Sequence, residues 1–426
     1  MSSGNRNQTE DRPGAGRKPG FQTELLHGRS SGRGGNGATL PEISQCTAYA
    51  YDTAEELERV FAGRAPGFVY TRIGNPTVSA FEQRVNELEG GAGAAACASG
   101  MAAIAATLLN ILSAGDEVIA PGALFGGTLD LFRDLEKFGI TVRYVPELTP
   151  ENVENAVDGR TRAVFGEVIS NPALQVADVK ALAESVHGLG LPLILDSTTA
   201  TPFLVRPIEL GADLVIHSAS KYMNGCGSAV GGVIVDSGRF AWDPEQYPAL
   251  KDYRKFGKLA FLARLRNDTG RNFGACLAPA NAYLNVLGLE TLGLRMDRIC
   301  RNAYELAAAL SRMDGIEVRY PLLPESPYRE LCRTQLGGRG GGILTFRAGS
   351  RERASRIINS LALAETATNI GDVRTLVIPP ASTIFLHSTE EERAAAGVYE
   401  DTVRVSVGIE DPEDLIADFT QAIEKL

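Results

Sequence analysis

The feature that most constrains the fold is a regular alternation of short apolar runs with segments of helical periodicity. Six runs have the length and composition of buried strands, and they lie at residues 117–120, 141–145, 163–169, 193–196, 213–217 and 232–236. Strands that alternate with helices in this way indicate a mostly parallel sheet with helices on its faces. We therefore expect an α/β fold for this part of the chain.

Composition and pattern divide the 426 residues into four expected regions. Residues 1–38 are rich in Gly, Arg, Ser and Asn, which predicts a disordered tail; an arm that closes over a neighbouring subunit is the alternative. Residues 39–70 are expected to form an N-terminal arm and residues 71–274 the large domain. Residues 275–426 are expected to form a smaller C-terminal α+β domain.

Three local patterns refine this division. A helix is expected to begin near Thr53, and a second helix over residues 78–90 has Thr77 as its expected cap. In the last region, apolar segments around 342–346 and 403–407 predict antiparallel strands, and a final helix follows them.

Charge and composition disfavour several classes of function. The formal net charge of −10 disfavours nucleic acid or an anionic membrane as the main partner. The apolar stretch 92–112 contains too many small and polar residues to span a bilayer. The six cysteines lack a paired CxxC spacing and no apolar signal core begins the chain, so we expect a cytoplasmic protein. Four histidines without an HExxH or Cys/His cluster give a metal site little support.

Two of the expected strands end in side chains that can do chemistry. The run 213–217 leads to Lys221, and the run 193–196 ends in Asp196. In an open α/β sheet, ligands bind at the carboxyl ends of the strands. A lysine and a carboxylate at one crevice suggest pyridoxal 5'-phosphate (PLP), which needs a lysine for its Schiff base and an acid to keep its ring nitrogen protonated. Both residue types are common, so this pair alone is weak evidence.

Serines near these strand ends strengthen the case for a phosphate. Ser99, Gly100 and Met101 lead into an alanine-rich helix whose first N–H groups are free to meet an anion. Taken alone, this pattern fits a capped helix better. Ser218 and Ser220 flank the lysine and add hydroxyl donors, and the three serines together favour a phosphate site.

Three further residues are candidates for contact with the cofactor or substrate. The ring of Phe125, beside two glycines, could stack on a flat cofactor, although core packing explains it equally well. Asn171 precedes a proline at a strand end and either bonds the phenolic oxygen of the cofactor or forms a turn. Arg404 stands in an apolar strand, where a guanidinium is costly unless it meets an anion such as a substrate carboxylate.

These residues, in this order, resemble the fold type I PLP enzymes of cysteine and methionine metabolism, the family of cystathionine γ-synthase, methionine γ-lyase and O-acetylhomoserine sulfhydrylase. The resemblance runs from about residue 40 to the end and is closest to the sulfhydrylase branch. Its motifs are 70–77 (YTRIGNPT), 255–261 (KFGKLAF), 288–291 (GLET), 340–346 (GGGILTF) and 405–411 (VSVGIED). It implies a mostly parallel seven-stranded sheet with helices on both faces.

The resemblance also assigns roles to individual residues. It implies that Lys221 forms the Schiff base and shuttles protons, that Asp196 pairs with the ring nitrogen, and that Asn171 contacts the ring oxygen. The phosphate would be held by Gly100, Met101, Ser218 and Ser220, with Tyr70 and Arg72 reaching it from a neighbouring subunit, and the substrate carboxylate by Asn369 and Arg404. Active sites are thus expected to be shared within a dimer, and two dimers to form a homotetramer.

The implied reaction removes the α and β protons of an amino acid, expels its γ substituent and leaves a vinylglycine ketimine. A nucleophile then adds at Cγ, or the intermediate decays to a 2-oxo acid. Phe125 departs from the tyrosine usual in the family, so a hydroxyl that helps to protonate a departing thiolate is missing. This disfavours γ-lyase action on methionine or cystathionine and favours O-acyl-homoserine or S-adenosylmethionine, whose leaving groups need little protonation.

Other departures from the sulfhydrylase pattern fall in motifs expected around the pocket, at Ser44, Cys46, Cys226, Pro379, Ile384 and Phe385. We therefore expect a PLP-dependent γ-replacement enzyme of a specialised biosynthetic pathway, with carbon as a candidate nucleophile. Ordinary O-acetylhomoserine sulfhydrylase is the first alternative. A non-catalytic scaffold is the alternative of another class, and a nicotinamide-dependent dehydrogenase is disfavoured because no GxGxxG turn is present.

Overall fold

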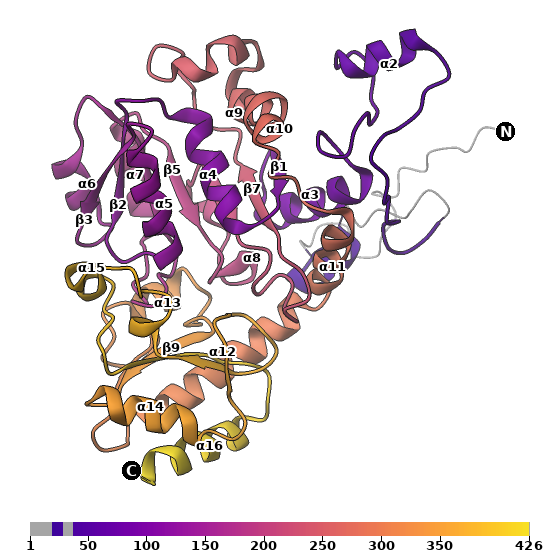
Figure 1. Cartoon of the computed structure of the whole chain (residues 1–426). Coiled ribbons are helices and arrows are strands. Elements are labelled where there is room, and N and C mark those ends of the chain that lie inside the picture. Colours follow the sequence, from indigo (N-terminus) through magenta and orange to yellow (C-terminus); the bar gives the residue numbers. More distant parts are fainter. Residues whose placement is uncertain (1–18, 29–36, 426) are drawn as a thin grey trace.

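A seven-stranded sheet forms the larger layer of the structure, a computed structural model that describes residues 19–28 and 37–425 (Figure 1). The strand order is β1-β7-β6-β5-β4-β2-β3. The strands are β1 (Gly93–Cys97), β2 (Glu117–Pro121), β3 (Thr141–Val145), β4 (Thr161–Glu167), β5 (Leu193–Asp196), β6 (Leu214–His217) and β7 (Gly232–Asp236). Strand β7 is antiparallel to both neighbours and the other pairs are parallel, so the expected mostly parallel seven-stranded sheet is confirmed.

Helices cover both faces of this sheet because successive residues of each strand point to opposite sides. Phe165 and Ile194 pack on one face in a cluster that includes residues of α4 (Gly100–Ile111) and α5 (Gly126–Glu136). Val164 and Leu195 pack on the other face, with α3 (Pro76–Glu89), α7 (Val179–Gly188), α11 (Pro279–Leu289) and α12 (Leu292–Leu310). Each such buried side chain contributes about 1.5–3 kcal/mol, so the two apolar clusters hold the sheet rigidly between its helices.

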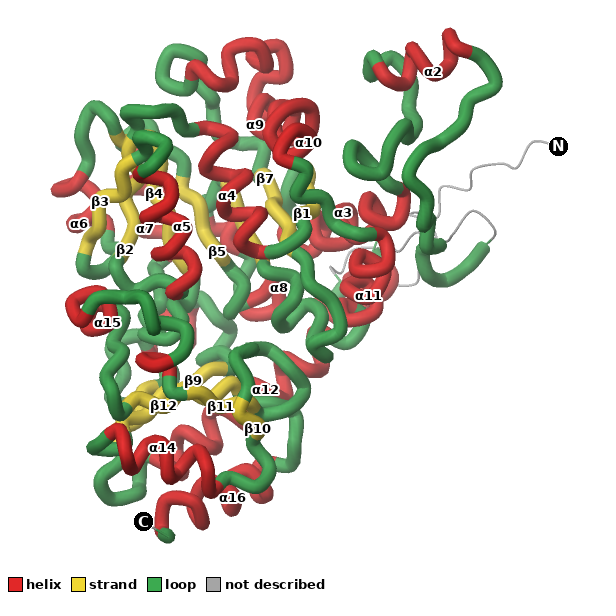
Figure 2. Tube along the Cα trace, in the orientation of Figure 1, coloured by secondary structure: helices red, strands yellow, loops and turns green. Residues whose placement is uncertain are grey.

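A second sheet of five strands follows in the C-terminal part of the chain (Figure 2). Its order is β10-β11-β12-β9-β8, with β8 (Glu317–Arg319), β9 (Ile343–Arg347), β10 (Glu365–Thr366), β11 (Leu376–Ile378) and β12 (Thr402–Ser406). Its apolar side chains pack against α12, α14 (Arg351–Ser360) and α16 (Pro412–Glu424). The expected antiparallel pair is present as β9 and β12, whereas the domain boundaries given above stay predictions.

Shorter elements complete the described chain. They are α2 (Ala54–Phe61), α6 (Pro150–Ala156), α8 (Thr201–Leu204), η1 (Pro207–Leu210), η2 (Pro248–Leu259), α9 (Ala260–Arg264), η3 (Leu265–Thr269), α10 (Gly270–Phe273), α13 (Arg329–Thr334), η4 (Pro380–Ser382) and α15 (Glu390–Ala395). The helix expected near Thr53 is α2, where the Thr53 hydroxyl accepts from the N–H of Glu56. Among the described helices, none has the length and apolar character needed to cross a membrane.

Strand β1 is absent from the runs that the sequence pattern identified. Its residues, Gly-Ala-Ala-Ala-Cys, include no β-branched or aromatic side chain, and such residues are what marks a strand in a sequence. The strand forms because β7 supplies an antiparallel partner along its whole length, from Gly93 opposite Asp236 to Cys97 opposite Gly232. Tertiary pairing thus overrides local propensity here.

The expectation of a disordered tail over residues 1–38 is wrong for residues 21–27, which form helix α1 (Phe21–His27). Leu25 is buried in the cluster on the α3 face, and Glu24 pairs with Arg206 at 2.6 Å. The ring of Phe21 meets that of Phe203 edge to face. These contacts repay the entropy of ordering, which local composition does not reveal. The rest of the predicted tail lies outside the described residues, apart from positions 19, 20, 28, 37 and 38.

The cap of helix α3 is Asn75, not Thr77 as expected. The Asn75 side-chain oxygen accepts from the N–H groups of Thr77 and Val78, and Pro76 takes the first helical position, where its missing N–H is harmless. The Thr77 hydroxyl instead donates to the carbonyl of Glu42 at 2.7 Å. Sequence reasoning failed because two adjacent residue types could both cap the helix.

Replacing Asn75 by alanine should lower the free energy of unfolding by about 2 kcal/mol, at the upper end of the range for helix caps, because its amide also donates to Ser44 and Tyr49. The control is Thr149→Ala, which removes the single side-chain cap bond of α6 and should cost about 1 kcal/mol. Urea unfolding followed by circular dichroism measures both. Equal losses would mean that the additional amide bonds contribute nothing.

Candidate active site

The predicted site residues gather around one cavity of about 820 Å³. It lies where β4, β5 and β6 end, and residues 368–370, 383–384 and Arg404 from the C-terminal region close its other side. Nearly all candidates from the sequence line it: Ser99, Gly100, Met101, Phe125, Asn171, Asp196, Ser218, Ser220, Lys221, Asn369 and Arg404. Tyr70 and Arg72 are the exceptions.

Lys221 follows β6 and is held by a residue from the other side of the cavity. Its Nζ donates to the side-chain oxygen of Asn369 at 2.7 Å. Burial, and then the nearby positive charge of Arg404, lower the pKa of Lys221 to about 8. A larger fraction of this amine is therefore neutral near pH 7 than for an ordinary lysine, and a neutral amine is what a Schiff base requires.

Asp196 is the last residue of β5 and lies at the base of the cavity. One carboxylate oxygen accepts from the N–H of Thr198 at 2.9 Å. Burial raises the pKa of Asp196, while the bonds from Thr198 and the charge of His217 oppose the rise. A cationic ring nitrogen placed against this carboxylate would offset the desolvation, so the residue fits the expected partner of a protonated pyridine.

The start of α4 provides an anion-binding end of the cavity. The Ser99 hydroxyl accepts from the N–H of Ala102, while the first N–H groups of a helix have no partner within it. A Cβ atom on Gly100 would come within 2.6 Å of the Ser218 Cβ, which explains why glycine stands there. The Ser220 hydroxyl is engaged with Gly231, donating to its carbonyl at 3.1 Å, so it must rotate before it can donate to a phosphate.

Arg404 forms the opposite, cationic end of the cavity. It sits in β12, is 2 % exposed, and donates to the side-chain oxygen of Asn171 at 3.3 Å and to the Asn369 carbonyl at 3.0 Å. Its Nε has no partner, and no carboxylate of the described residues pairs with it. Burial lowers its pKa to about 10, so it remains charged at neutral pH. A buried cation without an anion fits a substrate carboxylate.

Phe125 and Asn171 are linked by a residue that the sequence reasoning missed. Glu167, the last residue of β4, accepts from the N–H of Phe125 at 2.8 Å and from that of Asn171 at 2.9 Å. It also lines the cavity. The available sign was a carboxyl group inside the apolar run 163–169, which the structure shows to end as a strand at Glu167.

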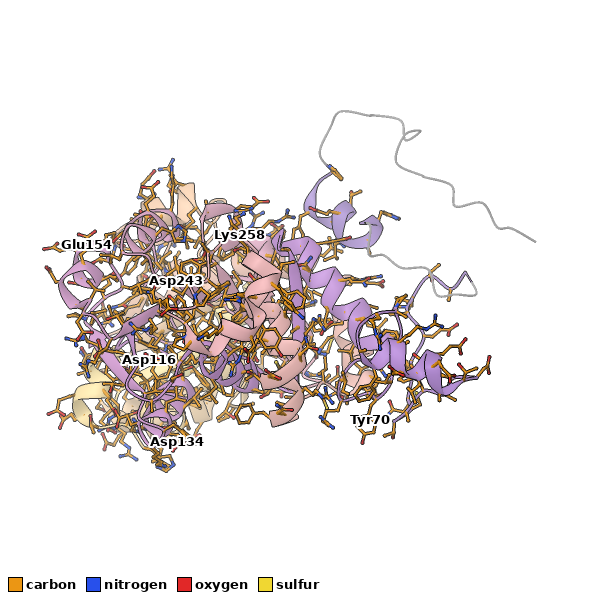
Figure 3. All side chains as sticks on the ribbon, turned by 90° about the horizontal axis from the view of Figure 1, so that it is seen from above. Tyr70, Asp116, Asp134, Glu154, Asp243 and Lys258 are labelled. Carbon is orange, nitrogen blue, oxygen red and sulfur yellow. The ribbon has the colours of Figure 1, made fainter. Side chains whose placement is uncertain are left out.

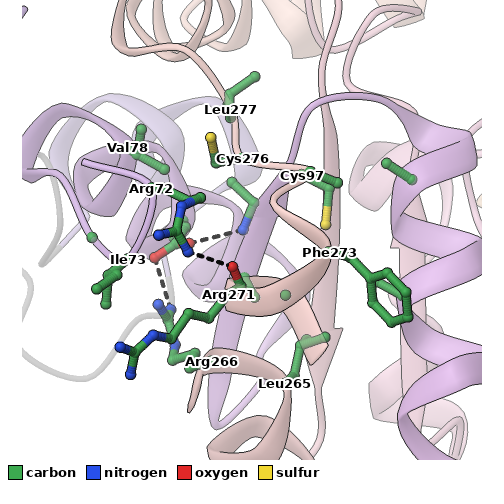
Figure 4. A pocket seen from close by; sticks show the side chains of 18 of the residues that line it. Arg72, Ile73, Val78, Cys97, Leu265, Arg266, Arg271, Phe273, Cys276 and Leu277 are labelled. Carbon is green, nitrogen blue, oxygen red and sulfur yellow. Dashed lines mark hydrogen bonds and ion pairs between the residues drawn. The ribbon is translucent and has the colours of Figure 1, made fainter. Parts of the chain in front are cut away.

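Tyr70 and Arg72 lie away from the Lys221 cavity of their own chain. Tyr70 is 40 % exposed at the edge of the molecule (Figure 3), and the Arg72 guanidinium lies 5.4 Å from the centre of its ring. Arg72 lines a separate cavity of about 200 Å³ with Cys97, Cys276 and Phe273, and donates to the Arg271 carbonyl at 2.6 Å (Figure 4). Within one chain, both residues are unavailable to the site.

The six positions that depart from the sulfhydrylase pattern also fall into two groups, those that line the Lys221 cavity and those that lie away from it. Ile384 lines the Lys221 cavity, whereas Cys226 and Pro379 do not and Phe385 is buried in a core cluster. Ser44 and Cys46 lie in the arm that holds Tyr70, since Ala48 forms a bridge with that residue. Among these six positions, Ile384 alone lines the cavity of its own chain, as does Phe125, the departure already described.

Comparison with known proteins agrees with this geometry. Residues 22–424 match the family described as Cys/Met metabolism PLP-dependent enzymes. The chain belongs to this family. It is 38 % identical to the homocysteine synthase of Schizosaccharomyces pombe, with 95 % of this chain and 98 % of that protein covered. It is 40 % identical to the O-acetyl-L-homoserine sulfhydrylase of Corynebacterium glutamicum, with 94 % and 95 % covered.

A solved structure extends the match to three dimensions. It is a putative O-acetylhomoserine (thiol)-lyase from Campylobacter jejuni that contains N'-pyridoxyl-lysine-5'-monophosphate, with a TM-score of 0.90, 35 % identity, and 95 % of this chain and 99 % of that chain covered. The protein is thus a fold type I, PLP-dependent enzyme of the Cys/Met metabolism family. The unpartnered Arg404 Nε and the crowded Gly100 are features of its own cavity that fit this cofactor and an amino-acid substrate.

In the cofactor-free protein, the rate at which PLP attaches to Lys221 should rise with pH around a midpoint near pH 8 and level off above it, because the neutral amine is the reacting form. Arg404→Met removes a neighbouring positive charge, so the lysine should hold its proton to higher pH and the midpoint should move up. Stopped-flow absorbance measures both profiles. A wild-type midpoint near that of an ordinary lysine would contradict the expectation.

Proposed function

We propose that the protein catalyses PLP-dependent γ-replacement on an amino acid with a good γ leaving group, either an O-acyl-homoserine or S-adenosylmethionine. The wall of the cavity carries this proposal: among its described lining residues none is Tyr, His or Cys, and Phe125 stands where the family usually has a tyrosine. Glu167 also lines the cavity, but both of its oxygens accept backbone N–H groups. A thiolate leaves poorly without an acid to protonate it, whereas a carboxylate or a thioether needs little or no protonation.

The residues at the two ends of the cavity would orient the substrate. Arg404 would bind the α-carboxylate through guanidinium N–H groups, and Asn369 would add an amide from the same side. The Lys221 amine, once released from the cofactor, would carry protons to and from the substrate carbons. PLP, when bound, supplies the electron sink that stabilises negative charge on those carbons.

Ser99, Gly100, Met101, Ser218 and Ser220 would hold the cofactor phosphate, Asp196 its ring nitrogen, and Phe125 and Asn171 its ring face and ring oxygen. Support comes from their convergence on one cavity from several loops.

The identity of the nucleophile follows less directly from the cavity than that of the amino-acid substrate. A carbon nucleophile in a specialised biosynthetic pathway is our proposal, and Ile384 in the cavity wall is its support because an apolar side chain favours an apolar second substrate.

Sulfide is the alternative nucleophile, which would make the protein an O-acetylhomoserine sulfhydrylase that forms homocysteine. This alternative is favoured by the names of the two relatives with 38 % and 40 % identity. We therefore expect mass spectrometry of the purified protein with O-acetyl-L-homoserine and sulfide to separate the two. Rapid homocysteine formation would favour the sulfhydrylase, and γ-elimination of acetate without homocysteine would favour another nucleophile.

The leaving-group argument can be tested with one hydroxyl. We expect the wild-type protein to act on O-acetyl-L-homoserine at least about 100-fold faster than on methionine, since a positioned general acid contributes about 10²–10⁴-fold. Phe125→Tyr should narrow this ratio, because it returns an acid to the cavity wall. The measurement is kcat/KM for both substrates. Equal rates of acetate and methanethiol release by the wild type would overturn the argument.

We infer that the active sites are shared within a dimer and that two dimers form a homotetramer. Two observations support this: Arg72 and Tyr70 are out of reach of their own Lys221 cavity, and Phe61 and Phe273 near them are 58 % and 68 % exposed. The guanidinium of Arg271, which lies two residues before Phe273 in the sequence, is 5.5 Å from the centre of the Phe61 ring. Large exposed apolar side chains of this kind are typical of interfaces.

Mixing two inactive variants tests the shared site. Lys221→Ala and Arg72→Ala should each lack activity, but random pairing should restore roughly a quarter of the wild-type rate, because half of the dimers are hybrids with one intact site of two. Activity is measured after mixed refolding, with each variant refolded alone as the control. No restoration would mean that Arg72 does not act across a dimer.

A further inference from the structure

The end of strand β4 connects two loops that both border the cavity. Glu167 accepts from the N–H of Phe125 through Oε1 at 2.8 Å and from the N–H of Asn171 through Oε2 at 2.9 Å. Phe125 belongs to the loop after β2 and precedes α5, whereas Asn171 belongs to the loop after β4. One carboxyl group thus fixes two backbone segments that are far apart in the sequence.

The surroundings of Glu167 leave these two bonds as its main partners. The residue is 9 % exposed, and no cationic side chain of the described residues pairs with it. Its register neighbour on β5 is Asp196. Burial, and then the charge of Asp196, raise the pKa of Glu167 to about 8, against the effect of the two N–H donors. Burying a carboxyl group here costs free energy. Its presence therefore indicates a need for hydrogen-bond acceptors, which an apolar residue could not supply.

We propose that Glu167 is a positioning residue, which holds the ring of Phe125 and the side chain of Asn171 at the distance from each other that the cofactor requires. The proposal rests on the contacts proposed above for Phe125 and Asn171. Both oxygens of Glu167 are occupied by backbone N–H groups, so the residue acts through those two neighbours and not on the substrate. Because both segments are fixed in advance, cofactor binding loses less conformational entropy in ordering them.

The Glu167→Gln variant tests this role because it keeps the size of the side chain but has one oxygen in place of two. Its NH₂ group would face an N–H donor, so one of the two segments must move. We expect the dissociation constant of PLP from the cofactor-free protein to rise about tenfold, since a buried N–H donor left without its acceptor costs about the equivalent of that change. Absorbance titration with PLP measures it.

Asp418→Asn is the matched control. Asp418 is also buried, at 5 % exposure, and its carboxylate accepts from the backbone N–H groups of Ala362, Leu363 and Ala364 in the C-terminal region. It lines no part of the Lys221 cavity. This variant should lower the thermal unfolding midpoint while leaving the PLP dissociation constant within about twofold of wild type, because only local stability is affected.

Three results would overturn the proposal. They are a PLP dissociation constant for Glu167→Gln within twofold of wild type, an equal loss of PLP affinity in Glu167→Gln and Asp418→Asn, or wild-type PLP affinity in Glu167→Asp. The aspartate variant decides if the glutamine variant does not fold, because it keeps the carboxyl group but is one methylene too short to reach both N–H groups. Cofactor titration does not depend on γ-replacement. If Glu167→Gln weakens PLP binding but the wild-type protein fails to act on the proposed substrates, the proposed reaction is wrong and the role of Glu167 still holds.

Discussion

The parallel register of β4, β5 and β6 is the constraint on which the site depends. It sets Glu167 beside Asp196 and Asp196 beside Ile216, so three neighbouring strands end at one edge and release their loops into the same cavity. Hydrogen bonding of the ladder fixes this alignment before any ligand is present. The Lys221 loop, the Asp196 carboxylate and the Glu167 anchor of Phe125 are consequently held by one hydrogen-bonded ladder.

Much of this arrangement could be predicted because it depends on the local order of apolar and polar residues in the sequence. Apolar runs that end in Asp196 or lead to Lys221 mark the strand ends directly. A single arginine, Arg404, in an apolar strand predicts a buried charge. Glu167 lies inside the apolar run 163–169, so the sequence did not mark it as a strand end, and its two partners, Phe125 and Asn171, come from different loops. Only the folded chain shows that one carboxyl joins them.

Other elements could not be predicted because distant partners create them. The alanine-rich β1 forms through β7, and α1 forms through Arg206 and Phe203, which lie far along the chain. Arg72 likewise does not line the Lys221 cavity of its own chain, and the partner proposed for it lies in a second chain. Local propensity carries no information about such partners, whether they lie in the same molecule or in a second one.

Arg404 also has a consequence for the evolution of the enzyme. A guanidinium that is 2 % exposed, with an unpartnered Nε and no carboxylate of the described residues beside it, is costly to the fold. An apolar side chain of similar volume would pack there at less cost. Selection for stability alone would not favour this arginine, so its cost to the fold supports the carboxylate-binding role proposed for it.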